Sequence, residues 1–358
     1  MKWYGIGDDF GNSEISTAVS NGGGQPLVRS IPTAFKDVTD MRQLESLGQD
    51  LNSINSIRLH GEDISYVLGD FALAQYKDAW NGRGDIMRYA SKYHKIGLLS
   101  SAASMIPDRE FGLYIVTGLP ATTFIKKPDL RGKMKEALDG THVFTTDMGK
   151  TWRTVAVEVV NVIMEGAGAL LYYGSRSSNK DEMHAVIDIG GRTTDLYVAQ
   201  GQRPLQDYCK GTPIGVESAA DIVKSLCEQK HDLEVSNHDA QLILRAFSTG
   251  NSSHYPTMMV YGRQVPWIAL QDIAQEAANN VADRLVSFVS SAWNENERGS
   301  VGSRFSTVLN IGGGTFYFHT ALKRRIPHLS RPSDPVHANA QGYSTLAARL
   351  GEQKQRSA

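Results

Sequence analysis

The chain has 358 residues, of which 41% are hydrophobic and 21% are charged. This length suits about two domains, each with its own core. The 37 basic and 38 acidic residues nearly balance, so no global basic field favours direct binding to DNA. The two cysteines, Cys209 and Cys227, form no CxxC motif, which argues against a zinc site. No apolar run reaches the ~20 residues of a membrane span. We therefore expect a cytoplasmic protein that binds neither membranes nor, directly, DNA.

The first informative segment is a glycine-containing turn between two strand-like runs near the N-terminus. Residues 3–6 are strand-like, residues 7–13 read Gly-Asp-Asp-Phe-Gly-Asn-Ser, and residues 14–19 alternate in polarity. A tight hairpin turn explains this pattern by itself. Glycine also lets a backbone approach a ligand closely, because it has no Cβ. Asp8 and Asp9 add acidic groups at the same place.

The segment from residue 64 to residue 173 shows ordinary strand and helix patterns. These patterns predict a strand at 64–69, a helix at 71–80 and one helix over 85–105. They then predict a charged helix or turn at 131–138, a hairpin formed by strands 142–146 and 153–163, and a small-residue helix that starts at 165.

A second glycine turn follows the apolar run 185–189, which contains Asp188. Gly190, Gly191, Arg192, Thr193 and Thr194 come next, and then a strand-like run at 196–199, so this segment predicts a β-hairpin. Glycine N–H groups in such a turn suit phosphate oxygens. A buried aspartate is costly unless it is paired or lies near a metal, and a nucleotide phosphate with Mg²⁺ would supply that partner. The alternative is an ordinary hairpin in which the aspartate caps a turn.

The C-terminal part of the chain predicts helices around a third glycine turn. Residues 215–228 and 239–247 have helical patterns, and a long helix runs from 265–267 to about 293 with apolar residues at helical spacing. The strand-like run 307–311 then leads into Gly312, Gly313 and Gly314. The last helix is expected at 341–350, followed by a frayed polar tail.

Strand, glycine turn and polar or acidic residue thus occur three times, widely spaced, which suggests a nucleotide held between two similar halves. In this order the chain resembles the actin-like ATPase superfamily. Residues 114–120 (Tyr-Ile-Val-Thr-Gly-Leu-Pro), the connection at 160–169 and the Ala-Asn-x-x-Gly element at 338–342 resemble the ParM-type plasmid-segregation actins. The resemblance implies an α/β fold of the actin type, with two related RNase H-like domains that flank a nucleotide cleft. It places domain I at 1–163 with a return at 335–358, and domain II at 164–334.

The resemblance has three departures. The usual first loop reads Asp-x-Gly-Phe/Tyr-Gly-Asn, but here Gly7 stands where the acid is expected and Asp9 where the glycine is expected. Either Asp8 or Asp9 has taken over, or the turn is one residue shorter. Met164 replaces a common proline. Arg192 either contacts phosphate or points into solvent.

The resemblance also implies roles for the residues of the three turns. Glu165 would orient the attacking water, and Asp8 or Asp9, together with Asp188, would hold Mg²⁺ largely through water. The remaining residues would contact the nucleotide, which is ATP, with GTP possible. These contacts are Gly11, Asn12 and Ser13 in the first phosphate loop, Gly190, Gly191, Arg192, Thr193 and Thr194 in the second, and Gly312, Gly313 and Gly314 at the adenosine.

The function that follows from this resemblance is an ATPase that polymerises with itself into dynamic filaments and moves plasmid DNA through a DNA-bound adaptor protein. The alternatives are a non-filamentous small-molecule kinase or other ATPase of the same fold, and an MreB-like cytoskeletal actin.

Overall fold

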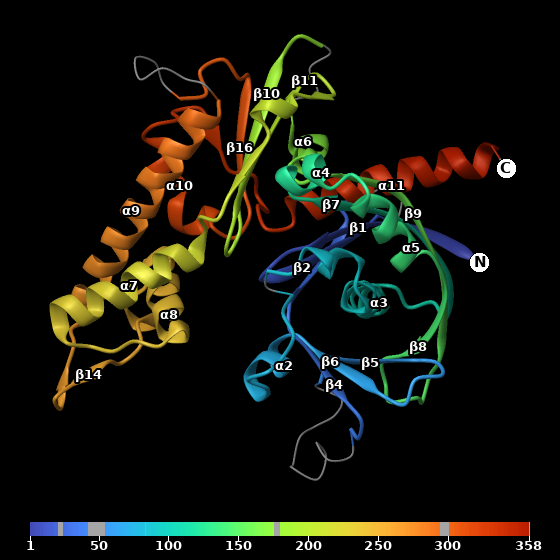
Figure 1. Ribbon diagram of the computed structural model, residues 1–358, viewed down its shortest axis with the longest axis horizontal. Coiled ribbons are helices and arrows are strands. Elements are labelled where there is room, and N and C mark those ends of the chain that lie inside the picture. Colours follow the sequence, from blue (N-terminus) through green and yellow to red (C-terminus); the bar gives the residue numbers. More distant parts are fainter. Residues whose placement is uncertain (21–23, 42–53, 83, 175–179, 294–300, 358) are drawn as a thin grey trace. The chain divides into compact units, whose positions relative to one another are not determined.

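The computed structural model describes residues 1–20, 24–41, 54–82, 84–174, 180–293 and 301–357. The chain forms two compact units, one made of Met1–Tyr173 and Val336–Ala358 and the other of Gly174–Pro335. Each unit combines a β-sheet with helices, so the predicted α/β class is confirmed (Figure 1). The domain limits predicted from the sequence stay a prediction. None of the helices in the described ranges is long and apolar enough to cross a membrane.

The first unit is built on a curled sheet whose described strands have the order β3-β2-β1-β7-β9-β8-β5-β6-β4. Strands β1, β7 and β9 are parallel to one another, whereas the hairpins β1–β2 and β8–β9 are antiparallel. The strands are β1 (Lys2–Phe10), β2 (Glu14–Ser20), β3 (Leu27–Pro32), β4 (Phe35–Val38), β5 (Ser56–Leu59), β6 (Ser65–Leu68), β7 (Glu110–Leu119), β8 (Gly140–Thr145) and β9 (Arg153–Met164).

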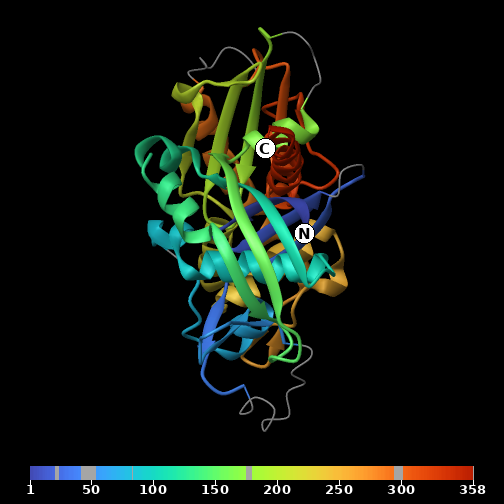
Figure 2. The same cartoon turned by 90° about the vertical axis from the view of Figure 1, so that its right-hand side faces the viewer.

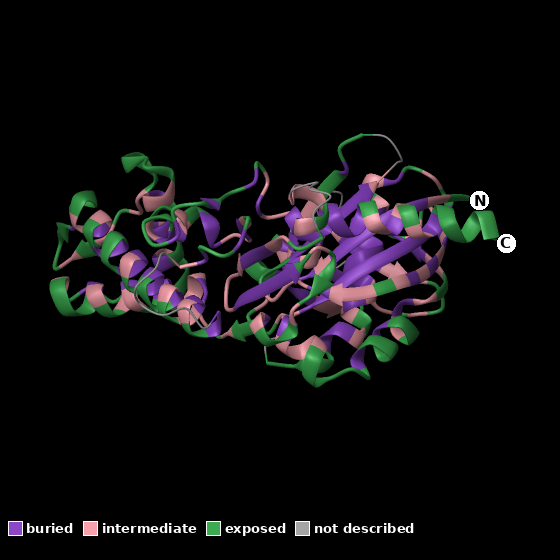
Figure 3. Ribbon diagram, turned by 90° about the horizontal axis from the view of Figure 1, so that it is seen from above, coloured by how far each residue is buried: buried purple, intermediate pink, exposed green. Residues whose placement is uncertain are grey.

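The helices of the first unit lie on both faces of this sheet. Helix α3 lies inside the curl and α11 packs against β1, β2 and β7 (Figure 1); Figure 2 shows α11, in red, close to end-on. Figure 3 shows that the central strands are buried along most of their length. The helices are α2 (Asp70–Gln75), the 3₁₀ turn η1 (Ile86–Ala90), α3 (Lys92–Met105), α4 (Ala121–Lys126), α5 (Leu130–Leu138), α6 (Ala167–Tyr173) and α11 (Ala338–Ser357).

Successive side chains of β1 point to opposite faces, as a pleated strand requires. Ile6 and Phe10 belong to the core on the α3 side. The other face meets the backbone of α11, because a Cβ at Gly7 would overlap the carbonyl oxygen of Ala340 and lie 2.5 Å from the nitrogen of Ser344. Glycine in β1 therefore allows α11 to lie directly on the strand.

The second unit contains a smaller sheet in which β10 pairs with β11 as a hairpin and runs parallel to β16. Its strands are β10 (Met183–Ile189), β11 (Thr194–Gln200), β12 (Arg203–Pro204), β13 (Lys210–Thr212), β16 (Thr307–Ile311) and β17 (Leu329–Ser330), and a separate hairpin consists of β14 (Met259–Val260) and β15 (Arg263–Gln264). The helices are α7 (Val216–His231), α8 (Asn237–Thr249), α9 (Trp267–Ala292) and α10 (Thr315–Lys323), with 3₁₀ turns η2 (Gln206–Tyr208) and η3 (Ser252–His254).

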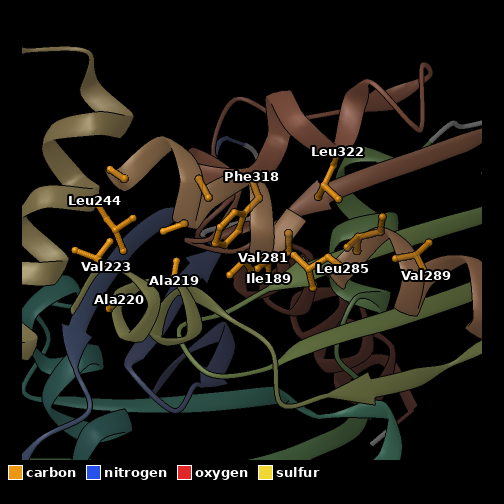
Figure 4. Close-up of a cluster of buried hydrophobic side chains, with 14 of the residues drawn as sticks. Ile189, Ala219, Ala220, Val223, Leu244, Val281, Leu285, Val289, Phe318 and Leu322 are labelled. Atoms are coloured by element: carbon orange, nitrogen blue, oxygen red, sulfur yellow. The ribbon is translucent and has the colours of Figure 1, made fainter. Parts of the chain in front are cut away.

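The core of the second unit forms where α7, α8, α9 and α10 pack together and against the sheet. Figure 4 shows Val223 and Leu244 meeting from α7 and α8, and Val281, Leu285 and Phe318 meeting from α9 and α10. The apolar stripe predicted for the long helix is thus core, because Ile273, Ala277, Val281 and Leu285 are all buried.

Three local predictions are wrong. The helix expected over 71–80 ends at Gln75, because Tyr76 has an extended backbone (φ −124°, ψ 109°). The single helix expected over 85–105 is divided, because Ser91 has an extended backbone (φ −91°, ψ 162°) and caps α3 with its hydroxyl. The tail expected to fray after residue 350 continues as helix to Ser357.

Candidate functional site

The parallel strands of the first unit end at one edge of the sheet, and two predicted acids lie there. In the parallel register Asp8 faces Thr117, and Leu119 faces Met164. Asp9 therefore lies near the end of β1, and Glu165 directly follows β9. Ligands of α/β sheets bind outside the carboxyl ends of such strands, so this edge is the candidate site of the unit.

Asp8 points away from this edge into the core and is completely buried. One carboxylate oxygen accepts a hydrogen bond from Thr17 Oγ1 at 3.3 Å, and the other lies 2.6 Å from Nε2 of His94. A buried carboxylate needs such partners. Asp8 is thus engaged inside the unit and does not face the edge of the sheet.

His94, which sequence reasoning did not single out, fixes this arrangement. Its Nδ1 lies 2.6 Å from the carbonyl oxygen of Tyr89, and its ring stacks on Phe10 with a centroid distance of 4.4 Å. Because a carbonyl oxygen accepts but cannot donate, Nδ1 carries a proton. The other ring nitrogen, Nε2, faces Asp8, so His94 links this acid to the backbone of η1.

Asp9 lies on the opposite face of β1 and is half-buried. Its carboxylate accepts a hydrogen bond of 3.4 Å from Nδ2 of Asn339. Burial, followed by the negative charge of Asp8, raises the pKa of the Asp9 carboxyl to about 6. The hydrogen bond from Asn339 and then the positive charge of Arg88 oppose this shift. Ionisation of Asp9 therefore costs the folded protein free energy, and carboxyl groups perturbed in this way are concentrated at functional sites.

The turn after Asp9 is held in place by hydrogen bonds to the carbonyl oxygen of Gly11. The carbonyl oxygen of Gly11 accepts hydrogen bonds of 2.9 Å from Thr33 Oγ1 and from Nη1 of the buried Arg88. A Cβ at Gly11 would overlap the carbonyl oxygen of Glu14, so the close turn requires glycine. Asn12 is half-buried and Ser13 is exposed at the turn. Sequence reasoning missed Arg88, because nothing local links it to a turn 77 residues earlier.

Glu165 occupies the two-residue turn between β9 and α6. Its N–H donates to the carbonyl oxygen of Leu119 at 2.9 Å, which extends the pairing of β9 with β7. Gly166 follows in a left-handed conformation (φ 88°) that favours glycine. The side chain of Glu165 is half-buried. The backbone on both sides of this acid is therefore fixed.

In the second unit, Asp188 and the glycine turn lie at the end of the β10–β11 hairpin. Asp188 is half-buried and pairs in register with Asp195 across the hairpin and with Ile311 of the parallel β16. Gly312, in a left-handed conformation (φ 80°), is so close that a Cβ there would lie 2.6 Å from Oδ1 of Asp188. The second and third predicted turns are thus adjacent at one edge of this sheet.

The hairpin turn uses its carbonyl groups to anchor helix α7. The carbonyl oxygens of Gly190 and Gly191 accept the first N–H groups of the helix, from Val216 at 3.2 Å and Glu217 at 2.7 Å. The N–H of Gly190 donates to the carbonyl oxygen of Thr193 at 2.8 Å. The carbonyl groups of this turn are thus directed at the helix, and Gly191 and Thr193 are half-buried.

Arg192 and Thr194 make contacts inside the second unit. Nε of Arg192 lies 3.2 Å from a carboxylate oxygen of Glu217, at the start of α7. Thr194 is buried and its hydroxyl donates to the carbonyl oxygen of Ile214 at 2.7 Å. Both side chains therefore help to hold the hairpin against the segment that leads into α7.

The third turn joins β16 to helix α10. The N–H of Gly314 donates to the carbonyl oxygen of Ile189 at 2.8 Å, which ties this turn to the end of β10. A Cβ at Gly314 would lie 2.8 Å from Cβ of Ile189, whereas a Cβ at Gly313 would meet nothing within 4 Å. Gly313 therefore lies at an open position between two glycines that are closely packed.

Two family models match most of both units. The model described as the N-terminal domain of actin-like proteins matches residues 7–168, and the model described as the archaeal actin homologue MreB-like, C-terminal, matches residues 186–324. The chain belongs to the actin-like superfamily. No curated protein sequence matches it.

Solved structures of actin-like proteins share the fold. The archaeal actin homologue Ta0583 is 21% identical, with a TM-score of 0.74 over 98% of this chain and 100% of that chain. A ParM from Clostridium botulinum, solved as a 15-stranded filament, is 19% identical, with a TM-score of 0.72 over 98% and 100%. Bacillus thuringiensis ParM, solved with ATP, is 16% identical, with a TM-score of 0.68 over 99% and 100%. The predicted actin-like fold is confirmed.

The resemblance predicts that residues 7–13 and 188–194 bind phosphate and that residues 312–315 lie at the adenosine. We use the names phosphate loop one, phosphate loop two and adenosine loop for these three turns. The described residues contain no group of three His, Cys, Asp or Glu side chains that could hold a metal ion. Mg²⁺ does not need such a group, because it keeps several waters and takes one or two carboxylates. Asp9 and Asp188 each place one half-buried carboxylate beside a glycine turn, and these donors fit Mg²⁺ bound largely through water.

We expect Asp9→Asn to stabilise the protein by about 1–3 kcal/mol at pH 7.5, since one pKa unit corresponds to about 1.4 kcal/mol. The folded-state pKa of Asp9, about 6, lies above its ordinary value of 3.8, so ionisation costs the folded state. This cost is absent below pH 4, grows between pH 4 and pH 6 and is complete above. Urea denaturation from pH 4.5 to pH 7.5 measures the effect, with the exposed Asp272→Asn as control. A stability difference that does not change with pH would contradict it.

Proposed function

We propose that this actin-like chain binds ATP with Mg²⁺, hydrolyses it and polymerises in its ATP-bound state. The observation that carries the proposal is that each unit ends its parallel strands in a glycine turn with a half-buried acid beside it, Asp9 in phosphate loop one and Asp188 in phosphate loop two. Ordinary hairpins need neither the acid nor the close backbone packing around Gly11 and Gly312.

The proposed nucleotide contacts come mainly from the backbone. N–H groups of Gly11, Asn12 and Ser13 in one unit, and of Gly191 and Thr193 in the other, would bind phosphate oxygens. Gly313, where a Cβ would meet nothing within 4 Å, would lie close to the adenosine. ATP is the proposed nucleotide because one relative was solved with ATP, and GTP is the alternative.

Hydrolysis needs an oriented water and stabilisation of charge on the transferred phosphoryl group. Mg²⁺ would neutralise part of that charge, held through water by Asp9 and Asp188. Asp8 is not assigned this role, because it is buried against His94. Glu165 would accept a hydrogen bond from the attacking water and align it. Its fixed backbone at the end of β9 suits this task.

The proposed partner of the protein is another copy of itself. A ParM relative was solved as a filament, and release of phosphate would weaken the contacts between subunits. The proposed cargo is plasmid DNA, reached through a DNA-bound adaptor protein because the nearly balanced charge of this chain offers no general attraction to DNA.

A cytoskeletal role of the MreB type is the second candidate, because the family model that matches residues 186–324 is described as MreB-like. A non-filamentous kinase of the same fold is the third. These candidate functions share the nucleotide site and differ in the process that is coupled to cleavage of the nucleotide.

Ultracentrifugation of the purified protein tests the proposal. We expect the protein to pellet with ATP and Mg²⁺ and to stay in the supernatant with ADP or without nucleotide, while inorganic phosphate accumulates. A protein that stays in the supernatant at all concentrations and transfers phosphate to a small molecule would contradict filament formation and support a kinase.

A further inference from the structure

The amide of Asn339 joins two parts of the first unit that carry the proposed chemistry. Asn339 lies in the first turn of α11 and is 2% exposed. Its Oδ1 accepts the N–H of Gly166 at 2.9 Å, directly after Glu165, and its Nδ2 donates to Oδ2 of Asp9 at 3.4 Å. One side chain thus contacts phosphate loop one and the turn that holds the proposed water-orienting acid.

The orientation of the Asn339 amide is determined by its two hydrogen-bond partners. A backbone N–H can only donate, so the oxygen of Asn339 must face Gly166, and the nitrogen then faces the carboxylate of Asp9. An aspartate at position 339 could accept the hydrogen bond from Gly166 but would place a second carboxylate beside Asp9. An alanine at this position could form a hydrogen bond with neither Gly166 nor Asp9. Asparagine is therefore the residue that matches an N–H on one side and a carboxylate on the other.

The backbone that carries Asn339 is held in place by close packing. A Cβ at Gly342 would lie 2.7 Å from Cα of Gly168, in the helix α6 that follows Glu165. On the β1 side, Gly7 lies directly under Ala340 and Ser344. Because α11 packs closely on both of these sides, a short side chain at 339 can define the geometry between Asp9 and the Glu165 turn.

We propose that Asn339 is a positioning residue that sets Glu165 relative to the acid of phosphate loop one. The proposal rests on the function proposed above for Glu165 and Asp9. Asn339 does not touch substrate in this role; it acts through the two groups that its amide holds. The sequence signal was present as the Ala-Asn-x-x-Gly element, but that element alone did not show what the amide contacts.

The test compares Asn339→Ala, which removes both contacts, with Asn339→Asp, which keeps the acceptor for Gly166. We expect Asn339→Ala to lower kcat about tenfold or more, since small misplacements of catalytic groups have effects of this size. Asn339→Asp should instead raise KM for ATP with Mg²⁺ by about fivefold or more and lower kcat less, because it disturbs Asp9 but not the Glu165 turn. A purely structural role would lower the melting temperature without this division between kcat and KM.

Gln341→Glu is the matched control. Gln341 is as buried as Asn339 and lies on the same helix, but its Oε1 accepts a hydrogen bond from Tyr173 at 2.6 Å. We expect this variant to keep kcat and KM within about twofold of the original protein, since it leaves the interactions of Asp9 and Gly166 in place. Equal losses in Gln341→Glu and Asn339→Asp would overturn the proposal.

Amide hydrogen exchange keeps this inference separate from the ATPase proposal. Exchange at residues 164–170 should become faster in Asn339→Ala and stay slow in Asn339→Asp, whether or not the protein hydrolyses ATP. Unchanged exchange in Asn339→Ala would overturn the proposed contact. Exchange that changes as expected in a protein without ATPase activity would support the contact and contradict the proposed function alone.

Discussion

Glu165→Gln is expected to slow phosphate release by about 10²–10⁴-fold, the range typical of a lost general acid–base group, while ATP binding and assembly persist. The substitution keeps the size and the backbone of the residue, whose N–H stays bonded to Leu119. It removes the charge that would attract a proton of the attacking water. Filaments of this variant should therefore form with ATP and last much longer than those of the original protein. Phosphate release and pelleting, measured on the same samples, check both halves of this expectation.

Glu158→Gln is the matched control for this variant, since Glu158 lies on the same strand and its carboxylate pairs with Lys354 at the surface. It should hydrolyse ATP at close to the original rate. If Glu165→Gln released phosphate as fast as this control, Glu165 would not be the residue that orients the water.

Gly7→Asp, which would restore the acid that the family usually carries at this position, is expected to destabilise the protein by at least about 3 kcal/mol. A Cβ at position 7 already overlaps the carbonyl oxygen of Ala340 in α11. The added carboxylate would moreover be buried between a strand and a helix. Gly7→Ala, which adds the Cβ alone, should cost about 1–3 kcal/mol. Urea denaturation followed by circular dichroism measures both values.

Gly132→Asp serves as the control for this change, because Gly132 is exposed in α5 and a Cβ there would meet nothing within 4 Å. It should leave the free energy of unfolding nearly unchanged. A Gly7→Asp variant as stable as this control, with improved ATP hydrolysis, would show that the acid belongs at position 7 and that α11 moves away readily.

The fold was predictable where local patterns are strong. The β8–β9 hairpin, the long helix α9 and the glycine turns after β1, β10 and β16 all lie where the sequence places them. The spacing of the hydrophobic residues and the residue types in the turns determine such elements locally. The pattern of the helix expected over 85–105 continues across Ser91, but the helix is divided because Ser91 caps α3 with its hydroxyl.

The choice between Asp8 and Asp9 could not be made from the sequence. Neighbouring residues of a strand face opposite sides, and the partners that tell these sides apart are distant in the chain. His94 lies on the side of Asp8 and Asn339 on the side of Asp9, 86 and 330 residues away from them. The same holds for Arg192, whose contact with Glu217 depends on how the loop after β11 returns to the hairpin.

ATP hydrolysis by this actin-like chain is proposed to govern the life of a filament. The most direct measurement follows right-angle light scattering and phosphate release in one cuvette after ATP and Mg²⁺ are added to the purified protein. We predict a rise in scattering that later decays as phosphate accumulates. Scattering that stays flat over a wide range of protein concentration, with or without phosphate release, would contradict the claim.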